Sequence, residues 1–269
     1  MPLSIATWNI NSVRLRLRLV LDYLARAKPD VLCLQETKCL DDLFPRAAFK
    51  EAGYGHQAIK GDKGYNGVAI LSRLPLGEPS ALPFGGKGDA RHIAADVVPA
   101  EGQSVAVHNF YVPAGGDIPD VALNVKFAHK LGFLADMRSW SSEQAERNLP
   151  LVITGDLNIA PYESDVWSHK QLLDVVSHTP IETEALEDIR LRGRWTDAIR
   201  HVIPEPERVY TWWSYRAADW AVSNRGRRLD HIWVSAPLAT RIGTVSIERE
   251  ARGLLRPSDH VPVLLSLDL

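Results

Sequence analysis

The sequence lacks the features that define exported or membrane-bound proteins. It contains two cysteines in 269 residues, too few for a disulfide framework, which indicates a reducing compartment. No apolar run approaches the roughly 18–20 residues that cross a bilayer, and no basic start precedes an apolar stretch as in a signal peptide. We therefore expect a cytoplasmic protein that does not associate with a membrane.

The chain also lacks a charge excess of either sign. Its 31 basic and 33 acidic residues give a formal net charge of −2. Global charge therefore provides no attraction to a polyanion, so nucleic-acid binding would depend on local basic patches or on a metal ion. No linker or internal repeat divides the chain, and its 45% hydrophobic content supports a large core. We predict a single domain over residues 1–269, and a monomer.

Short β-rich runs bounded by turn residues predict most of the regular structure. The predicted strands are 4–9, 31–35, 56–58, 67–72, 92–98, 104–111, 151–154, 231–234, 241–247 and 261–267. The predicted helices are 14–27, 43–51, 121–141 and 170–177. Helices are fewer than strands, and some strands follow one another directly. This order predicts an α/β protein with two mixed β-sheets packed face to face and helices outside, rather than a parallel βαβ array.

The start of the first helix is ambiguous. Residues 13–19 alternate with period two, as in a half-buried strand, but the longer window favours a helix because apolar residues recur at helical spacing. They are Leu17, Val20, Leu21 and Leu24. We expect Ser12 to cap this helix and residues 28–30 to end it.

Polar residues follow several of the apolar runs. Glu36 ends one run, and is either a solvated charge or a ligand for Mg²⁺, which takes oxygen ligands and commonly one or two carboxylates. Asp156 and Asn158 follow another run, where they form an Asx turn or act on a phosphoryl group. In the second case the aspartate would accept a proton from water and the asparagine amide would donate to a phosphoryl oxygen.

A histidine before the last predicted strand is either structural or catalytic. A catalytic histidine usually has its second ring nitrogen fixed by a carboxylate. Asp230, which begins another apolar run, is the expected partner of His260, and Asp259 is left for a metal or supporting role. Tyr111 at a strand end is either a core residue or a phenol that donates to a phosphate oxygen.

An aromatic and basic segment covers residues 210–228. Such a segment ordinarily combines core aromatics with a solvated charge run. It also suits an apolar slot for a base-free sugar, rimmed by arginines that bind phosphates. The glycine-rich segments 61–67 and 85–91 leave a similar choice, between surface turns and backbone cradles for a phosphate.

Six segments together resemble the exonuclease III family of apurinic/apyrimidinic endonucleases, within the endonuclease/exonuclease/phosphatase superfamily. They are Thr7-Trp8-Asn9-Ile10-Asn11, Leu34-Gln35-Glu36-Thr37, Tyr111-Val112-Pro113, Gly155-Asp156-Leu157-Asn158, Arg228-Leu229-Asp230 and Ser258-Asp259-His260. The resemblance covers the whole chain and implies a four-layer α/β sandwich that depends on Mg²⁺, with Mn²⁺ as a substitute. It implies double-stranded DNA as the substrate, incised 5′ to abasic sites and shortened 3′→5′ from recessed or blocked 3′ ends.

The resemblance also implies roles for individual residues. It implies that Glu36 is the principal metal ligand, that Asp156 acts on the attacking water, and that Asp230 orients His260. The implied catalytic residues are Tyr111, Asp156, Asn158, Asp230 and His260. The implied metal site comprises Asn9, Glu36, Asp156, Asn158, Asp259 and His260. The implied DNA contacts are Asn11, Trp212, Arg216, Asn224, Arg225, Arg228 and Leu229, with Trp212 and Leu229 in the sugar slot.

Two positions depart from the family pattern. Arg227 stands where other members often carry an apolar residue, and Asp117 stands where some members present a basic side chain. Both leave open the balance between abasic-site incision and exonuclease activity. Two other functions also remain open: a phosphodiesterase or phosphatase for lipid or inositol phosphates, and an inactive DNA-binding module.

Overall fold

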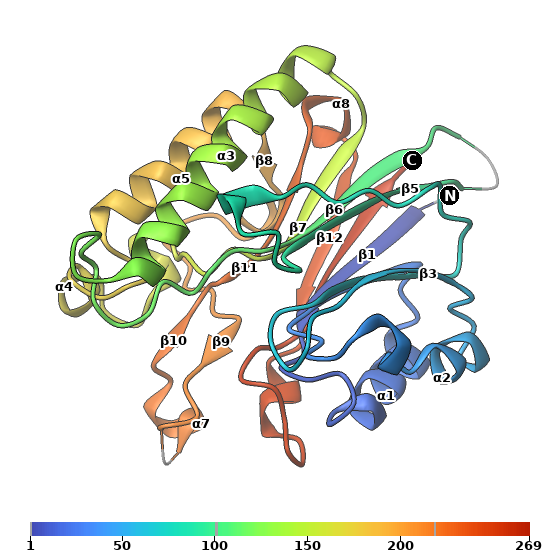
Figure 1. The fold of residues 1–269 in the computed structure, drawn as a ribbon, viewed down its shortest axis with the longest axis horizontal. Helices are drawn as coiled ribbons and strands as arrows, with labels where there is room; N and C mark the ends of the chain where they lie inside the picture. Colours follow the sequence, from blue (N-terminus) through green and yellow to red (C-terminus); the bar gives the residue numbers. More distant parts are fainter. Residues whose placement is uncertain (1, 100–101, 218) are drawn as a thin grey trace.

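Two mixed β-sheets pack face to face at the centre of the structure, and helices cover the outer face of each (Figure 1). The computed structural model describes residues 2–99, 102–217 and 219–269. The order of helix, sheet, sheet and helix confirms the predicted four-layer α/β sandwich.

Within the described ranges, sheet I has six strands in the order β12-β13-β1-β2-β4-β3, and sheet II has five in the order β5-β6-β7-β11-β8. Sheet I contains β1 (Pro2–Asn9), β2 (Val31–Gln35), β3 (His56–Lys60), β4 (Val68–Ser72), β12 (Ile242–Ile247) and β13 (Val263–Asp268). Sheet II contains β5 (His92–Val97), β6 (Val105–Tyr111), β7 (Leu151–Asp156), β8 (Thr196–Asp197) and β11 (Asp230–Val234). A separate ribbon pairs β9 (Trp212–Trp213) with β10 (Gly226–Arg227).

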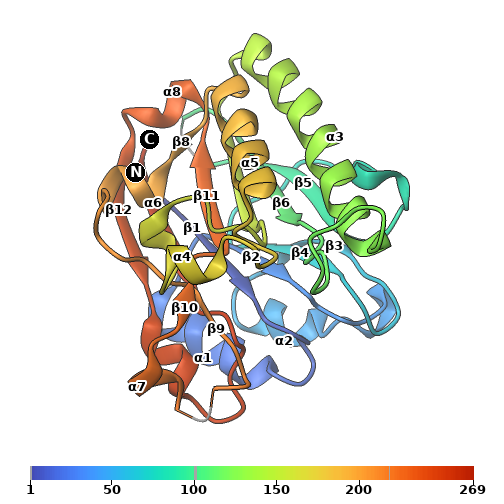
Figure 2. The same cartoon turned by 90° about the vertical axis from the view of Figure 1, so that its left-hand side faces the viewer.

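Helices lie on opposite sides of this double sheet, and short helical turns lie in the connections. Figure 2 shows the two longest helices on one side and the N-terminal helices at the other end of the view. The longer helices are α1 (Leu17–Ala27), α2 (Arg46–Glu51), α3 (Val125–Arg147) and α5 (Pro180–Arg192). The shorter ones are α4 (His169–Leu172), α6 (Ala198–Val202), α7 (Trp220–Ser223) and α8 (Ala236–Ala239). The 3₁₀ turns are η1 (Asp41–Leu43), η2 (Phe84–Gly86), η3 (Glu163–Asp165) and η4 (Arg249–Gly253). No helix in the described part of the chain is long and apolar enough to cross a membrane.

Three apolar clusters hold the layers together. The first lies between the two sheets and includes Ile5 of β1 and Val107 of β6. The second joins sheet I to α1 and α2 and includes Phe49. The third joins sheet II to α3 and α5 through side chains such as Phe133 and Leu186. Burial of this apolar surface is the main favourable term in folding, and it fixes which sheet face each helix covers.

A buried amide locks the two sheets together near the ends of their central strands. Asn109 of β6 donates from Nδ2 to the carbonyl oxygens of Leu34 and Ala69 in sheet I, each at 2.9 Å. Gln35 of β2 donates from Nε2 to Asn109 Oδ1 at 2.7 Å. Because unsatisfied buried polar groups are costly, these bonds specify how the sheets align, and they fix the position from which Glu36 leaves β2.

Strand register then brings the predicted site residues to one edge of the double sheet. β6 runs parallel to β7 with Tyr111 opposite Asp156, and β11 runs antiparallel to β7 with Asp230 opposite the same residue. In sheet I, parallel β1 and β2 place Asn9 opposite Gln35. These ends meet because β1 and β7 are in contact across the sheet interface.

The sequence predicts all of the longer strands to within two residues at each end. It misses β8, β9 and β10, which have two residues each; β9 lies in the β-rich run 209–213, which was interpreted only as part of the aromatic and basic segment. The predicted helices 43–51 and 121–141 begin later, at Arg46 and Val125. The helix predicted at 170–177 is only four residues long, and α5 was missed although Thr179 and Glu182 form a capping box at its start.

The predicted cap of the first helix is wrong. Helix α1 begins at Leu17 with Arg16 as its N-cap, and no side chain caps it. Ser12 has a φ of 86° and donates its backbone N–H to the Glu36 carbonyl at 2.7 Å. This long-range bond to the loop after β2 holds the segment before α1 out of the helical conformation. The predicted end is confirmed, because Lys28 adopts the left-handed conformation after Ala27.

Candidate active site

A cavity of about 670 Å³ opens at the edge where these strand ends meet. Its lining combines the predicted catalytic groups with the aromatic and basic segment. From the first set it contains Glu36, Tyr111, Asn158, Asp259 and His260. From the second it contains Trp212, Arg216, Arg225 and Arg227, and Leu229 and Asp117 also line it. Residues more than 200 positions apart in the sequence therefore share one pocket.

Asn9 joins the two sheets at the floor of the site. Its Nδ2 donates to Glu36 Oε1 and to Asp156 Oδ2, both at 2.8 Å. Glu36 has a φ of 50°, so the chain turns sharply as it leaves β2 and presents the carboxylate to the pocket. The Asn9 amide group thus holds the Glu36 carboxylate of sheet I and the Asp156 carboxylate of sheet II close to each other.

The turn after β7 depends on glycine. Gly155 has a φ of 136°, and a Cβ there would lie 1.9 Å from the carbonyl oxygen of Phe110. No other residue fits between β6 and β7 at this point. The turn is closed by Asp156 Oδ1, which accepts the backbone N–H of Asn158 at 2.9 Å. The Asx turn is therefore present, and it holds the Asp156 carboxylate and the Asn158 amide at the same end of β7.

The expected histidine–aspartate pair is present. His260 Nδ1 and Asp230 Oδ2 are 2.8 Å apart, and His260 Nε2 lies 3.7 Å from Asp156 Oδ2. Trp8 holds the histidine backbone by donating from Nε1 to the His260 carbonyl at 3.0 Å. Ser258 donates from Oγ to the Asn9 carbonyl at 2.6 Å, which ties the last motif to the first.

The pKa values of both His260 and Asp156 are raised, but for different reasons and with different consequences at neutral pH. Burial opposes protonation of His260, but Asp230 and Asp156 outweigh it and raise the pKa of the imidazole to about 10. Burial raises the pKa of Asp156 to about 7, against the attraction of His260 and with help from Asp230. At neutral pH the imidazole is therefore cationic, while the Asp156 carboxyl is close to the point where it gains or loses a proton.

Trp167, Trp212 and Trp213 form an aromatic wall of the pocket, and Asp259 connects the candidate catalytic groups to it. It accepts Trp212 Nε1 at 3.0 Å and Asn11 Nδ2 at 3.1 Å. Burial favours its neutral form, but His260, Trp212 and Asn11 together lower its pKa. Lys38, which the motif analysis overlooked, donates to Asn11 Oδ1 at 2.6 Å and lies 2.7 Å from Glu36 Oε2.

Tyr111 is buried at the end of β6 and lines the pocket. Burial raises the pKa of its phenol, and the nearby Glu36 and Asp156 carboxylates raise it further, so the hydroxyl keeps its proton and can donate it in a hydrogen bond. Arg91 lies 4.6 Å above the ring and also donates to the Tyr111 carbonyl at 3.3 Å. Arg91 was not predicted; it belongs to the second glycine-rich segment, which therefore supports Tyr111.

The aromatic wall has cations along it. Arg225 lies 4.6 Å above the ring of Trp167, and Arg227 lies 5.3 Å above that of Trp212. Arg227 also donates to the Val176 carbonyl at 3.0 Å. Leu229 is buried but also lines the pocket. Of the predicted DNA contacts, Asn224 lies outside the pocket at the end of α7, where it accepts from Trp213 and Arg249.

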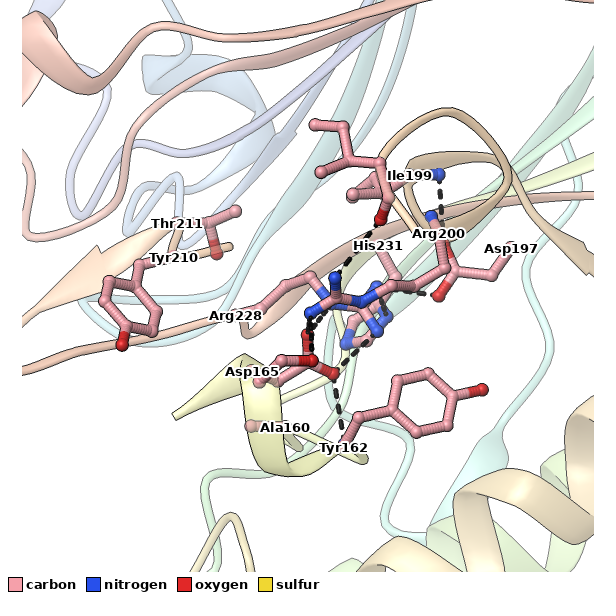
Figure 3. Close-up of polar contacts among 12 residues, drawn as sticks. Ala160, Tyr162, Asp165, Asp197, Ile199, Arg200, Tyr210, Thr211, Arg228 and His231 are labelled. Carbon is pink, nitrogen blue, oxygen red and sulfur yellow. Dashed lines mark hydrogen bonds and ion pairs between the residues drawn. The ribbon is translucent and has the colours of Figure 1, made fainter. Parts of the chain in front are cut away.

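The prediction that Arg228 contacts DNA is wrong. Its side chain is fully buried and points away from the pocket into a network of charged groups (Figure 3). It donates from Nε and Nη2 to both oxygens of Asp165, at 2.7 and 2.8 Å, and from Nη1 to Asp197 Oδ2 at 2.7 Å. The same Nη1 lies 3.1 Å from Nδ1 of His231, whose pKa is lowered to about 3 by burial and by Arg228. The neutral imidazole therefore accepts this bond.

The donor set fits a hard divalent cation. Carboxylates of Glu36 and Asp259 line the pocket, and Asn9 orients the first of them through its amide N–H; carboxylate oxygens are ligands that Mg²⁺ prefers. Asp156, Asp230 and His260 also have potential ligand atoms within 4.8 Å of one another. Within the described ranges, Oδ1 of Asp230 is buried and accepts no hydrogen bond, so the acidic site has unused acceptor capacity.

Comparison with known proteins agrees with this geometry. The model of the Endonuclease/Exonuclease/phosphatase family matches residues 6–260. The chain belongs to the endonuclease/exonuclease/phosphatase family. Among curated members of this family, exodeoxyribonuclease III of Haemophilus influenzae is 30% identical over 96% of this chain and 97% of its own. The predicted resemblance is thereby confirmed.

Two solved structures place the chain more closely within the endonuclease/exonuclease/phosphatase family. An AP endonuclease from Archaeoglobus fulgidus superposes with a TM-score of 0.91 and 34% identity, over 99% of this chain and 100% of that one. A 3′ phosphatase from Neisseria, bound to a product DNA hairpin, gives a TM-score of 0.90 and 34% identity over the same shares.

Proposed function

We propose that this protein is a DNA-repair nuclease that hydrolyses phosphodiester bonds in double-stranded DNA. One observation carries the proposal: the carboxylate and histidine groups and the Trp212–Arg225 wall line a single cavity of about 670 Å³. A lipid or inositol phosphatase needs the first set of groups but not an aromatic slot bordered by arginines. The names of the relatives, exodeoxyribonuclease III and AP endonuclease, support the same assignment.

The cofactor of this reaction is Mg²⁺, and Mn²⁺ substitutes for it. Glu36 is the principal ligand, because its carboxylate faces the pocket, with Asn9 and Asp259 beside it. Asp156, Asn158 and His260 complete the surroundings of the ion. When bound, the ion supplies Lewis-acid polarisation of the phosphoryl group and neutralises its developing charge. Asp230 already pairs with His260, which favours an orienting role for it over metal binding.

Asp156 and His260 have different roles because their environments separate their pKa values. Asp156, with a pKa of about 7, accepts a proton from the attacking water. His260, with a pKa of about 10, stays cationic and stabilises the negative charge of the transition state, with Asp230 holding its ring. This division follows the general rule that a pair of groups with separated pKa values divides the acid and base roles.

Tyr111 and Asn158 contact the phosphate. Both line the pocket, and the protonated phenol of Tyr111 donates to a non-bridging oxygen. The Asn158 amide donates to the Val112 carbonyl at 2.8 Å, which fixes the side chain at the pocket floor. In this arrangement the phenol is placed before substrate arrives, while the Asn158 amide, which also donates to Asp156 Oδ2 at 3.2 Å, exchanges that bond for one to the phosphate.

DNA lies along the wall of the pocket, with a base-free sugar between Trp212 and Leu229. Arg216 and Arg225 line the pocket, are exposed and bind the flanking phosphates. Asn224 precedes Arg225 in the chain, and Asn11 contacts the DNA from its position beside Asp259 and Lys38. Arg227 and Asp117 also line the pocket, so both act on the balance between abasic-site incision and 3′→5′ exonuclease activity. The protein works as a cytoplasmic, single-domain monomer.

Parallel assays of three substrates test this function. They are a labelled duplex with a central abasic analogue, a duplex with a recessed 3′ end, and a soluble inositol phosphate, each with Mg²⁺ and with EDTA. Metal-dependent cleavage of DNA alone supports the proposal. Hydrolysis of the inositol phosphate without cleavage of either duplex would contradict it.

A further inference from the structure

A charged pair lies completely buried behind the pocket. Lys130 of α3 and Glu182 of α5 are both fully inaccessible, and their Nζ and Oε1 atoms are 2.5 Å apart. A buried ion pair is a poor source of stability, because desolvation of the two charges offsets their attraction, and well-packed apolar residues often do as well. The pair therefore calls for an explanation in terms of what it holds in place.

Lys130 binds two loops that line the pocket. Its Nζ donates to the Asn158 carbonyl at 2.8 Å and to the Ala114 carbonyl at 3.4 Å. Asn158 and Ala114 both line the cavity, and they belong to the loops that follow β7 and β6. With Glu182 as the third acceptor, all three protons of the ammonium group are used.

Glu182 binds a third pocket segment. Its carboxylate accepts the backbone N–H of Ser177 at 2.9 and 3.0 Å, and the hydroxyl of Thr179 at 2.6 Å. Ser177 lines the pocket, and its Oγ accepts Nη1 of Arg227 at 2.6 Å. The Glu182 carboxylate thus fixes the position of the segment around Ser177, which in turn holds Arg227 against Trp212.

We propose that the Lys130–Glu182 pair is a positioning device that aligns three loops of the active-site pocket, through bonds to Asn158, Ala114 and Ser177. Lys130 and Glu182 touch no substrate; they act through the Asn158 amide on one side and Arg227 on the other. The inference rests on the proposed function for its effect on catalysis, but the alignment itself is a property of the free protein. An apolar pair would fill the same space without specifying the position of any loop.

The test compares the double variant Lys130→Met/Glu182→Gln with the wild type. Lys130→Met alone would leave the Glu182 carboxylate buried without a cation, and that change endangers folding, whereas the double variant leaves no buried charge. Glu182→Gln alone is a second variant: Lys130 keeps its bonds to the Asn158 and Ala114 carbonyls but loses its anionic partner, while the amide at position 182 can still accept a hydrogen bond. Lys126→Met is the matched control, since Lys126 is exposed on the same helix four residues earlier.

For the double variant we expect kcat to fall by about 10- to 100-fold, the usual effect of losing a supporting partner in a site, while KM for duplex DNA changes less than about threefold. Amide exchange of Ser177 and Thr179 should accelerate, while that of α3 and the core strands stays at the wild-type rate. Glu182→Gln should accelerate exchange at Ser177 and Thr179 with a smaller loss of kcat, and Lys126→Met should match the wild type.

Two results would overturn the proposal: a kcat of the double variant within about twofold of wild type, or accelerated exchange spread evenly over α3, α5 and both sheets. The second result would show a role in global stability only. Failure of the proposed function is a separate outcome, since the wild type itself would then leave both duplexes intact. The exchange measurements need no substrate, and they would still decide whether the pair aligns the loops.

Discussion

Arg228 offers the clearest separation of stability from DNA binding, because it lies within a run of arginines but is turned inward. Arg228→Met removes the four polar contacts that the guanidinium makes with Asp165, Asp197 and His231. Asp165, which is fully buried, keeps Arg200 as a cationic partner. Asp197 keeps the two backbone N–H groups that it accepts at the start of α6.

The magnitude follows from this loss of pairing. Removing one partner from a buried ion pair costs about 3–5 kcal/mol, because a buried charge is left uncompensated. At about 2 °C per kcal/mol for a chain of this size, the Tm should fall by roughly 6–10 °C. Arg225→Met is the control: its guanidinium is exposed above Trp167, where a cation–π contact contributes about 0.5–1 kcal/mol, so the Tm should fall by no more than about 2 °C.

The effects of the two variants on DNA binding should be the reverse of their effects on Tm: Arg225→Met should weaken binding more than Arg228→Met. Each phosphate contact that is lost reduces the slope of log Kd against log salt by about 0.9. Well below the melting temperature, Arg228→Met should keep the wild-type slope, whereas Arg225→Met should lower it by about 0.9. Thermal melts and salt titrations by fluorescence anisotropy measure both effects. If Arg228→Met left the Tm unchanged and lowered the salt slope, the inward orientation of Arg228 would be refuted.

Three further predictions concern the catalytic groups. Glu36→Ala should lower kcat/KM at low Mg²⁺ on the order of 100-fold, with partial recovery as Mg²⁺ is raised; no recovery in a metal titration would exclude Glu36 as the principal ligand. His260→Asn and Asp230→Ala should each lower single-turnover rates about 10³-fold or more, and the double variant should lose little beyond that; a near-wild-type Asp230→Ala would contradict the orienting pair. In EDTA, Asp156→Asn should raise the Tm more at pH 8 than at pH 5. Burial, opposed by His260, raises the pKa of Asp156 from 3.8 to about 7, so the free energy of unfolding of the wild type falls as the pH rises from about 4 to 7. Asn carries no charge at either pH and escapes this loss. A larger increase in Tm at pH 5 than at pH 8 would contradict this reasoning.

The sequence predicted that these groups converge because each candidate catalytic group lies at the end or just before the start of a strand. Glu36 follows β2 and Asp156 ends β7, so the edge at which they meet is fixed once the strands are identified. The His260–Asp230 pair followed from the same reasoning, and the structure confirms it at 2.8 Å. Neighbouring strand ends therefore carry enough information to assemble a site without knowledge of side-chain positions.

The failures arise where long-range contacts override local patterns. Arg227 and Arg228 are adjacent in an extended segment, so their side chains point to opposite sides, and they could not both have faced DNA. Ser12 satisfies a carbonyl after β2 instead of capping α1. Lys130 interrupts an apolar helix face, which is a visible signal, but its partner Glu182 lies 52 positions later and no spacing rule connects them.

Incision of a duplex with one central abasic analogue tests the central claim most directly. The wild type and Asp156→Asn are each bound to the labelled duplex, Mg²⁺ is added, and the products are mapped on a denaturing gel. We expect a single metal-dependent cut 5′ to the lesion by the wild type, and binding without a cut by Asp156→Asn. Incision by Asp156→Asn at the wild-type rate, or no incision by the wild type, would contradict the assignment of this pocket.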